Sequence, residues 1–395
     1  MKRQARNEPP RILAITPDNF VLKEIRLRMP LLNLQKQGLI RGFFIADEFL
    51  SEVPDDALFD AVWLQRVENR ELTGLLKDRL GGCFLYDIDD LLIGNASYLR
   101  VPPSRDPQGV ILALEACKAV SVTSHRLTAL LERYSGLSLS SKAVVCPNGF
   151  EFPRMARHPE RPAALLWTSQ DHAALVHSRD GIFDALVKFS GKHKLPVFHF
   201  GYIDEKLLAR LARPVNLGTT PYWHHKALLA SLPCSIGVAP LETSASPADL
   251  DFINSKSDIK MVEYGGLGHP AVYSNAPPYA DTGLKTGLLA DNDTVSWLAT
   301  LEHLYGEGWK RSAEEQEQVM ALRNMDRLAA ENWMEAINRV RLEQPVKAGE
   351  LKTSLPALTR GVIRRGFQYF SQYGAASTLD LLLSVVRDIA HRRWN

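Results

Sequence analysis

The sequence predicts an α/β protein made of two doubly wound, Rossmann-like domains that face a cleft, followed by a C-terminal helical extension. Short apolar runs alternate with longer amphipathic runs, the pattern of parallel strands covered by helices on both faces. The alternation is interrupted once, where residues 152–162 contain three prolines and several charges, and it then restarts. In such sheets a ligand binds at the carboxyl ends of the strands, so we expect the site between the two halves.

The composition fits an enzyme-sized protein of the cytoplasm. The chain has 395 residues, and 45% of them are hydrophobic, which is enough for two or three domain cores. Its 47 Lys and Arg nearly balance 45 Asp and Glu, so we expect no nucleic-acid partner. The four cysteines lie far apart in apolar segments, without zinc-site spacing, and are expected to be buried thiols. No secretory signal or membrane-spanning run is visible.

The apolar and amphipathic runs give expected element ranges. In the first half we expect a helix over 24–38, ended by Gly38, and strands at 11–16, 42–46, 61–65, 82–89, 119–124 and 143–148. In the second half we expect strands at 163–169, 195–202, 214–220, 235–241, 270–275 and 287–290. Helices are expected at about 178–192, 204–212, 223–231, 257–267, 292–306 and, as one long pattern, 312–343. The corresponding domains are 1–155, 156–345 and 346–395.

The last of these segments is basic and amphipathic. Aromatic residues and leucines are interleaved with more cations than anions: Arg360, Arg364, Arg365, Arg387, Arg392 and Arg393 against Asp380 and Asp388. Such a segment can lie on an anionic membrane surface, which would make the protein peripheral on the inner face of the membrane. It can equally pack on the body of the protein or form a homodimer contact, and the sequence leaves these interpretations open.

The stretch FINSKSDIKMVEYGGLGHPAVYSN, residues 252–275, carries the clearest chemistry. Asn254, Lys256 and Ser257 stand at the expected helix start, with Ser255 or Ser257 as N-cap, and a helix start binds phosphate readily. Lys256 and Lys260 are four residues apart, so both can neutralise a diphosphate. Glu263, one turn further, is placed to accept hydrogen bonds from ribose hydroxyls. The alternative is a solvated helix start with an incidental glutamate.

This stretch, with GVAPLE before it and APPY after it, resembles the donor-binding segment of GT-B glycosyltransferases of the GT4-like group (glycosyl transferases group 1). That group is often found in bacterial polysaccharide and O-antigen biosynthesis. VVCPNGFEF, ALLWTSQDHAALVHSRDGIFDAL and TTPYWHHKALLASLPCSIGVAPL are similar to other segments of the family, and the resemblance covers roughly residues 10–335. It implies an N-terminal acceptor domain and a C-terminal nucleotide-sugar donor domain.

The resemblance also assigns donor contacts. Glu263 matches the second glutamate of the family's E-x7-E motif, which contacts the ribose, whereas the first falls at Ser255, which is not acidic. The contact with the donor sugar is therefore open, and Glu242 is an alternative for it. The family's usual basic residues after the first strand of the donor domain are not obvious. The further donor-side candidates there and before the donor helix are Ser169, His172 and Tyr222.

An acidic cluster, YDIDDLL, follows another apolar run. Asp87, Asp89 and Asp90 are expected at the carboxyl end of a strand, facing the cleft, where one of them would act as general base toward an acceptor hydroxyl. His125, at the next strand end, is a second candidate base. The alternatives are a structural cap of the next element, and a metal or phosphohydrolase site suggested by the Asp-x-Asp spacing. Arg26, Arg28 and Arg66 carry no pattern that separates them from surface arginines.

Together these patterns predict a glycosyltransferase, hexosyltransferase-like, that moves a sugar from a nucleotide-diphosphate donor to a hydroxyl of a glycan or lipid-linked glycan. The resemblance implies that the anomeric configuration is retained. We expect no cofactor and no metal, because Lys256 and Lys260 would stabilise the leaving diphosphate. Two alternatives remain: a nucleotide-sugar epimerase on the same fold, and a non-catalytic scaffold of a glycan assembly complex. The missing first glutamate is the main support for the scaffold.

Overall fold

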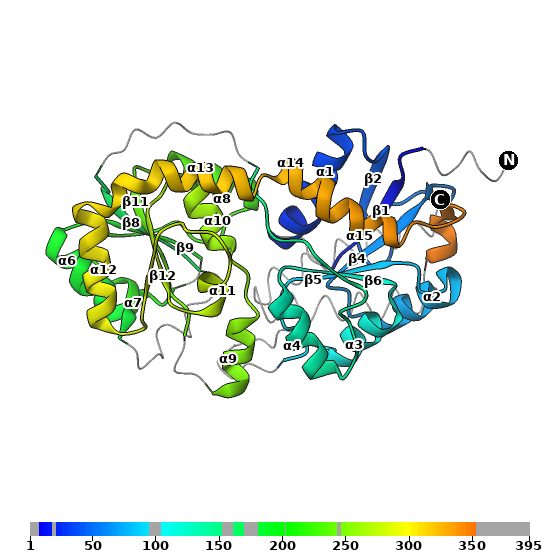
Figure 1. The fold of residues 1–395 in the computed structure, drawn as a ribbon, viewed down its shortest axis with the longest axis horizontal. Coiled ribbons are helices and arrows are strands. Elements are labelled where there is room, and N and C mark those ends of the chain that lie inside the picture. Colours follow the sequence, from blue (N-terminus) through cyan, green and yellow to red (C-terminus); the bar gives the residue numbers. More distant parts are fainter. Residues whose placement is uncertain are drawn as a thin grey trace, which may run out of the picture.

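The computed structural model describes residues 8–17, 21–94, 104–151, 161–169, 181–201, 203–242 and 246–352. These residues form two six-stranded parallel sheets that lie side by side, each with helices on both faces (Figure 1). We call the parts built on these sheets the first half and the second half. The predicted α/β fold with two Rossmann-like sheets is confirmed.

The first sheet has the strand order β2-β1-β4-β5-β6-β7. Its strands are β1 (Arg11–Ile15), β2 (Gly42–Ala46), β4 (Ala61–Gln65), β5 (Leu85–Ile88), β6 (Ala119–Val122) and β7 (Ala143–Val145). The second sheet has the order β10-β9-β8-β11-β12-β13. Its strands are β8 (Ala164–Thr168), β9 (Val197–Phe200), β10 (Pro214–Asn216), β11 (Ser235–Ala239), β12 (Ala271–Ser274) and β13 (Leu288–Ala290). Each of these strands falls within a predicted range.

The helices of the first half begin and end at the residues that cap helices well. Asn69, Asp106 and Ser124 accept backbone hydrogen bonds at the starts of α2 (Arg70–Leu80), α3 (Pro107–Ala116) and α4 (His125–Ser135). The predicted helix over 24–38 has two parts, the π-helical η1 (Lys23–Arg28) and α1 (Met29–Lys36). Gly38 follows it with a φ of 72°, the left-handed conformation expected of a C-terminal glycine.

The second half contains helices in the predicted ranges and three further helices, α9, α11 and η2, that were not predicted. They are α6 (Ile182–His193), α7 (Glu205–Leu208), α8 (Tyr222–Ser231), α9 (Pro247–Asn254), α10 (Ile259–Gly266), α11 (Pro277–Ala280), α12 (Thr294–Gly306) and the 3-10 helix η2 (Gly308–Arg311). α9 and α11 were not predicted, because Pro at their first positions resembles a loop signal as much as a helix start.

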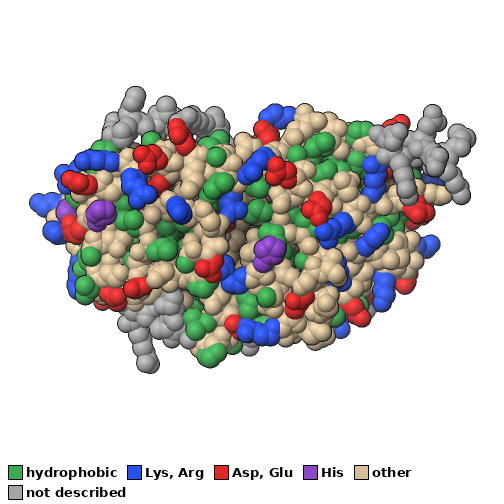
Figure 2. Space-filling model, viewed as in Figure 1, with side chains coloured by type: hydrophobic (Ala, Val, Ile, Leu, Met, Phe, Trp, Pro, Cys, Tyr) green, Lys and Arg blue, Asp and Glu red, His purple; other side chains and the backbone are tan. Residues whose placement is uncertain are grey.

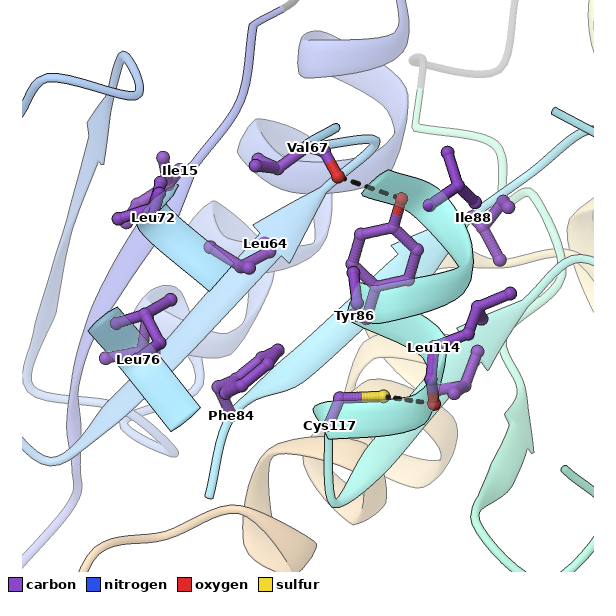
Figure 3. Packing of buried hydrophobic residues seen from close by; sticks show 14 of the residues in the cluster. Ile15, Leu64, Val67, Leu72, Leu76, Phe84, Tyr86, Ile88, Leu114 and Cys117 are labelled. Atoms are coloured by element: carbon purple, nitrogen blue, oxygen red, sulfur yellow. Dashed lines mark hydrogen bonds between the residues drawn. The ribbon is translucent and has the colours of Figure 1, made fainter. Parts of the chain in front are cut away.

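One of the two cores of the first half packs between its sheet and α2 and α3 (Figure 3), and the other packs on the opposite face of the sheet against η1 and α1. In the core beside α2 and α3, polar atoms are satisfied locally: the Tyr86 hydroxyl donates to the Val67 carbonyl at 3.1 Å, and Cys117 Sγ lies 3.5 Å from the Leu114 carbonyl. All four cysteines are free thiols; Cys117 and Cys146 are buried as expected, whereas Cys83 and Cys234 are half-buried.

The chain returns to the first half after the second sheet. The predicted single helix over 312–343 is wrong: α13 (Ser312–Leu322) ends at Arg323, and α14 (Met325–Leu328), η3 (Ala329–Trp333) and α15 (Met334–Arg339) follow. The break occurs because Asn324 caps α14 by accepting from the Arg327 N–H, and forms a β-bridge with Phe150.

This return segment, residues 325–351, packs into both cores of the first half, one on each face of the first sheet. Trp333 stacks on Trp63 with ring centroids 4.9 Å apart, and β14 (Val346–Lys347) pairs antiparallel with β3 (Leu58–Phe59). The 3-10 helix η4 (Ala348–Leu351) adds Ala348 and Leu351 to the core beside α2 and α3, whereas Trp63 and Trp333 belong to the core on the other face of the sheet. The predicted division at residue 345 did not foresee this packing, and the domain boundaries 1–155, 156–345 and 346–395 stay a prediction.

The basic amphipathic pattern of 353–395 lies outside the described residues. Within the described ranges, no helix combines the length and apolarity that crossing a bilayer requires.

The return segment gives a first testable expectation. Trp333→Ala removes a ring that is wholly buried against Trp63, so the first half should lose about 3–5 kcal/mol of stability. Hydrogen exchange should accelerate in β1 and β4 but not in β8 or β11. Val295→Ala, at a side chain that is 78% exposed, is the control and should change neither. Equal acceleration in both sheets would contradict the assignment of this segment to the first half.

Candidate active site

The loop after β5 meets the segment between α9 and α10, so the two halves touch at the carboxyl ends of both sheets. Lys256 Nζ lies 3.2 Å from Asp90 Oδ2. The Leu91 N–H donates to Ser255 Oγ at 3.1 Å, and Asn148 Nδ2 donates to Ser257 Oγ at 2.9 Å. Residues that sequence analysis placed in an acidic loop and in a donor segment are therefore direct neighbours.

The helix predicted to bind the donor begins later than predicted. α10 starts at Ile259, and its N-cap residue is Asp258, whose carboxylate accepts from Thr282 Oγ1 and Arg323 instead of capping the helix. The expectation that Ser255 or Ser257 caps this helix is wrong. Ser246 and Pro247 start another helix, α9, which occupies the chain up to Asn254.

The predicted helix-start residues consequently have other positions. Asn254 is the last residue of α9, and its carbonyl accepts from Arg126 Nε at 2.6 Å. Ser255 follows as the C-cap residue and donates to the Phe252 carbonyl. Lys256 lies in the segment between α9 and α10 and not in the predicted helix, with its ammonium 4.2 Å from the centre of the Phe252 ring.

α10 packs over the centre of the second sheet, where the strand order reverses between β8 and β11. The Tyr264 hydroxyl donates to the Val238 carbonyl at 3.3 Å and accepts from the Thr168 N–H at 3.1 Å. Gly237 makes this possible, because a Cβ there would lie 2.6 Å from the Tyr264 ring. Ligands of doubly wound sheets bind at such a reversal point.

Glu263 lies between two lysines. Its Oε2 is 3.3 Å from Lys260 Nζ, and its Oε1 is 3.6 Å from Lys226 Nζ, which comes from α8. Burial acts to raise the pKa of Glu263, but Lys260, Lys226 and His225 outweigh it and lower this pKa to about 2. Glu263 is therefore a carboxylate at neutral pH, held inside the protein by ion pairs.

Sequence analysis did not identify Lys226. Its side chain is only 1% exposed, in a stripe of buried residues along α8 with Tyr222 and Leu229. The spacing of Tyr222, Lys226 and Leu229 could have identified Lys226 from the sequence, since a lysine on the apolar face of a helix needs a buried anionic partner.

Asp87 is enclosed by protein contacts. Arg26 Nη2 donates to Asp87 Oδ1 at 2.6 Å and Arg26 Nε donates to Oδ2 at 3.2 Å, while Ser121 Oγ donates to Oδ1 at 2.7 Å. Both Arg26 and Asp87 are fully buried. The predicted role of Asp87 as a catalytic base does not fit this position, in which the carboxylate is the counter-ion of Arg26.

Asp89 and Asp90 face Arg66 at the junction of the halves. Arg66 Nε lies 3.5 Å from Asp89 Oδ1, and Arg66 Nη2 lies 3.8 Å from Asp90 Oδ2. Burial raises the pKa of Asp89 to about 6, and its Oδ1 accepts no hydrogen bond. Burial acts in the same direction on Asp90, but Lys256 and Arg66 outweigh it and lower the pKa of that carboxyl.

Arg66 has a φ of 52°, a conformation that non-glycine residues rarely adopt. Its N–H donates to the Asp87 carbonyl at 3.0 Å, which fixes the turn after β4 against β5. The backbone thus directs a guanidinium at two carboxylates, and strain of this kind is concentrated at functional sites.

The other predicted residues are dispersed around this junction. His125 is the exposed first residue of α4, directly after β6. Tyr222 is buried at the start of α8 with a hydroxyl that has no hydrogen-bond partner, and Glu242 is buried after β11. Ser169 is half-buried after β8, and its N–H donates to the Phe200 carbonyl. His172 lies outside the described residues.

Charges of both signs are interspersed over the face of the molecule in Figure 2, without one large basic or acidic field. Among the described side chains, no three His, Cys, Asp or Glu residues are grouped as metal ligands. Asp89 and Asp90 have Arg66 and Lys256 as their cationic neighbours.

Comparison with known proteins identifies structures of similar fold. No protein-family model and no curated protein matches the chain. HepE (Alr3699) from Anabaena, in a structure with UDP-glucose, aligns with a TM-score of 0.54 at 12% identity, covering 81% of this chain and 97% of HepE. An E. coli trehalose-6-phosphate protein bound with UDP-2-fluoro glucose aligns with a TM-score of 0.52 at 8% identity, over 84% of this chain and 100% of that one.

A third structure is the pneumococcal O-GlcNAc transferase GtfA in complex with UDP and GlcNAc, with a TM-score of 0.50 and 11% identity. The alignment covers 71% of this chain and 57% of GtfA. At such identities the similarity establishes the fold alone. The chain has the two-sheet architecture that the GT-B resemblance implied.

The two aspartates should respond differently to pH. Because the pKa of Asp89 rises from 3.8 to about 6 on folding, the wild type loses stability as pH rises between these values. Asp89→Asn avoids that loss, so its free energy of unfolding should gain about 2.4 kcal/mol relative to wild type between pH 4 and pH 7.

Asp90→Asn is the matched control. The pKa of Asp90 is lowered, so the wild type loses stability from this carboxylate only as pH falls below about 4, and the difference between this variant and wild type should stay nearly constant between pH 4 and pH 7. Urea denaturation at several pH values measures both differences. A difference for Asp89→Asn that does not change with pH would contradict the assigned environment.

Proposed function

We propose that this protein is a glycosyltransferase that moves a sugar from a nucleotide-diphosphate sugar to a hydroxyl of a glycan or lipid-linked glycan. One observation carries the proposal: the cationic segment before α10 in the second half faces the acidic loop after β5 in the first, with Lys256 Nζ 3.2 Å from Asp90. The similar folds seen with UDP and UDP-sugars support it. With the sequence resemblance, they favour a GT4-like enzyme of surface-polysaccharide or O-antigen assembly.

The donor would bind on the second half. Lys256 and Lys260, with side chains 33% and 25% exposed, are accessible to a diphosphate near the N-terminus of α10. Both lysines have carboxylate partners, so the diphosphate would replace Asp90 and one oxygen of Glu263 as their counter-charge. Glu263 would then accept from the ribose, as the resemblance implies.

The chemistry follows from the charges. As the bond between the anomeric carbon and the diphosphate breaks, the electron pair passes to the leaving oxygen, and Lys256 and Lys260 stabilise the charge that develops. The acceptor hydroxyl forms the new bond and gives its proton to the acidic loop. Asp90, with its lowered pKa, is ionised at neutral pH and is our candidate for that base. We propose that no metal or cofactor takes part and, from the resemblance, that the anomeric configuration is retained.

Binding of UDP to purified protein tests the donor site. Lys260→Ala should weaken binding by about 1.5–3 kcal/mol, the range for hydrogen bonds to charged groups. Lys310→Ala, at an exposed lysine of η2, is the control and should bind as wild type does. Calorimetry gives both affinities. Equal affinity of the Lys256→Ala and Lys260→Ala variants and wild type would refute this donor site.

Turnover separates the proposal from its alternatives. With nucleotide sugars and an acceptor, transfer should persist in excess EDTA, and Asp90→Asn should lower kcat more than donor affinity. An epimeric sugar nucleotide formed without acceptor would identify the epimerase, and tight UDP binding without any transfer would identify the scaffold. Restoration of activity by Mn²⁺ after chelation would instead favour a metal at the acidic loop.

We also propose that the protein is cytoplasmic and that the segment after Lys352 attaches it to anionic membrane. A truncated protein that tests this must keep residues 346–351, because Val346, Ala348 and Leu351 belong to the core beside α2 and α3. Full-length protein should float with anionic liposomes at low salt and less at high salt, whereas protein ending at Lys352 should not float. If neither floats and the truncation alone loses dimers, the segment serves oligomerisation.

A further inference from the structure

The two lysines beside Glu263 differ in access to solvent. Lys260, on the same helix as Glu263, has a side chain that is 25% exposed, whereas Lys226 on α8 is 1% exposed. Lys226 Nζ lies 4.8 Å from the centre of the Phe150 ring and 5.6 Å from that of Tyr222. A ligand in solvent can therefore reach Lys260, but aromatic rings enclose Lys226.

The Glu263 carboxylate needs a cation at all times. Its side chain is only 4% exposed, and a buried carboxylate that loses its counter-ion must either take up a proton or leave the fold strained. If Lys260 were the only partner, its departure to a diphosphate would leave Glu263 in that state. Lys226, at 3.6 Å from the other carboxylate oxygen, prevents this.

We propose that Lys226 is the fixed counter-ion of Glu263, which keeps Glu263 ionised while Lys260 turns to the diphosphate of the donor. This inference rests on the proposed function, and in it Lys226 acts on the substrate only through Glu263. Lys226 is a positioning residue: it holds an acceptor carboxylate ready for the ribose without touching the substrate.

The other groups around Glu263 cannot take over this task. From α8, His225 and Tyr222 face it, and burial lowers the pKa of His225 to about 4, so that its ring is neutral at pH 7. From α11, Tyr279 faces it, and on its own helix Tyr264 does; burial raises the pKa of both, so they stay protonated and neutral. Among the described groups named here, Lys226 is the cation that remains when Lys260 moves.

Lys226→Met tests the proposal because Met fills similar space without charge. In the variant, Glu263 should take up a proton when UDP draws Lys260 away. Calorimetry in buffers of different ionisation enthalpy should show proton uptake by the variant near pH 7 and none by wild type. The affinity of the variant should fall by about tenfold per pH unit between the pKa that Glu263 has in the free variant and the higher pKa that it has in the complex, since binding is linked to one proton in that interval.

Two further variants isolate the charge. Lys226→Arg keeps the cation and should bind UDP without proton uptake. Lys226→Met combined with Glu263→Gln contains neither charge, so its proton uptake should vanish even if its affinity is low. A purely structural Lys226 would alter melting temperature without linking UDP binding to a proton.

A measurement on wild type avoids dependence on variants that fold poorly. In protein with ¹⁵N-labelled lysines, UDP should shift the Lys260 Nζ resonance and leave that of Lys226 in place. Normal binding by Lys226→Met without proton uptake, or a shift of Lys226 instead of Lys260, would overturn the inference alone. Wild type that binds no UDP would overturn the proposed function as well.

Discussion

The geometry of the junction depends on the buried ion pair between Arg26 and Asp87. The Arg26 guanidinium holds Asp87 of β5, donates to the Cys146 carbonyl at 2.6 Å and to Asn148 Oδ1 at 3.2 Å after β7, and stacks over the Trp333 ring at 4.4 Å. Asn148 in turn donates to Ser257 in the second half. A buried pair of this kind adds little net stability, but removing either charge leaves the other uncompensated at a cost of about 3–5 kcal/mol. One cation therefore fixes two strand ends and the return segment.

Neighbouring carboxyls at the junction differ because their surroundings differ. Asp90 has Lys256 within 3.2 Å, whereas Asp89 faces Arg66 with an oxygen that accepts no hydrogen bond. Burial raises the pKa of Asp89 to about 6 in spite of Arg66, whereas Lys256 and Arg66 outweigh burial at Asp90 and lower the pKa of that carboxyl. Such a divergence separates an acid from a base within one loop. The second half contributes to the lowered pKa of Asp90, since Lys256 belongs to it.

The sequence predicted the elements that local patterns determine. Apolar runs located the strands of both sheets, and the cations near α10 identified the side of the second half that meets the first. Features set by contacts distant in sequence were missed. α10 starts later than predicted because α9 occupies the residues before it. The predicted helix over 312–343 breaks where Asn324 forms a β-bridge with Phe150.

Roles within a charged cluster were equally beyond local reasoning. Asp87, Asp89 and Asp90 look alike in the sequence, and the alternation of a strand does not tell which carboxylate finds a buried arginine. Arg26 reaches Asp87 across 61 positions, and Lys226 lies 37 positions before Glu263. Each pairing requires the folded arrangement of several elements.

The chain leaves the first half after Phe150 and re-enters it at residues 323–325, so the first half is discontinuous in the sequence. These two connections lie side by side. The Phe150 N–H donates to the Arg323 carbonyl at 2.7 Å, and the Met325 N–H lies 3.3 Å from the Phe150 carbonyl, so the outgoing and returning strands form one short ladder. Topologically, the second half is an insertion within the first (Figure 1). One contiguous fragment can contain the whole second sheet together with α13. No such fragment can contain the first half alone, because Trp63 and the Trp333 that covers it stand on opposite sides of the insertion.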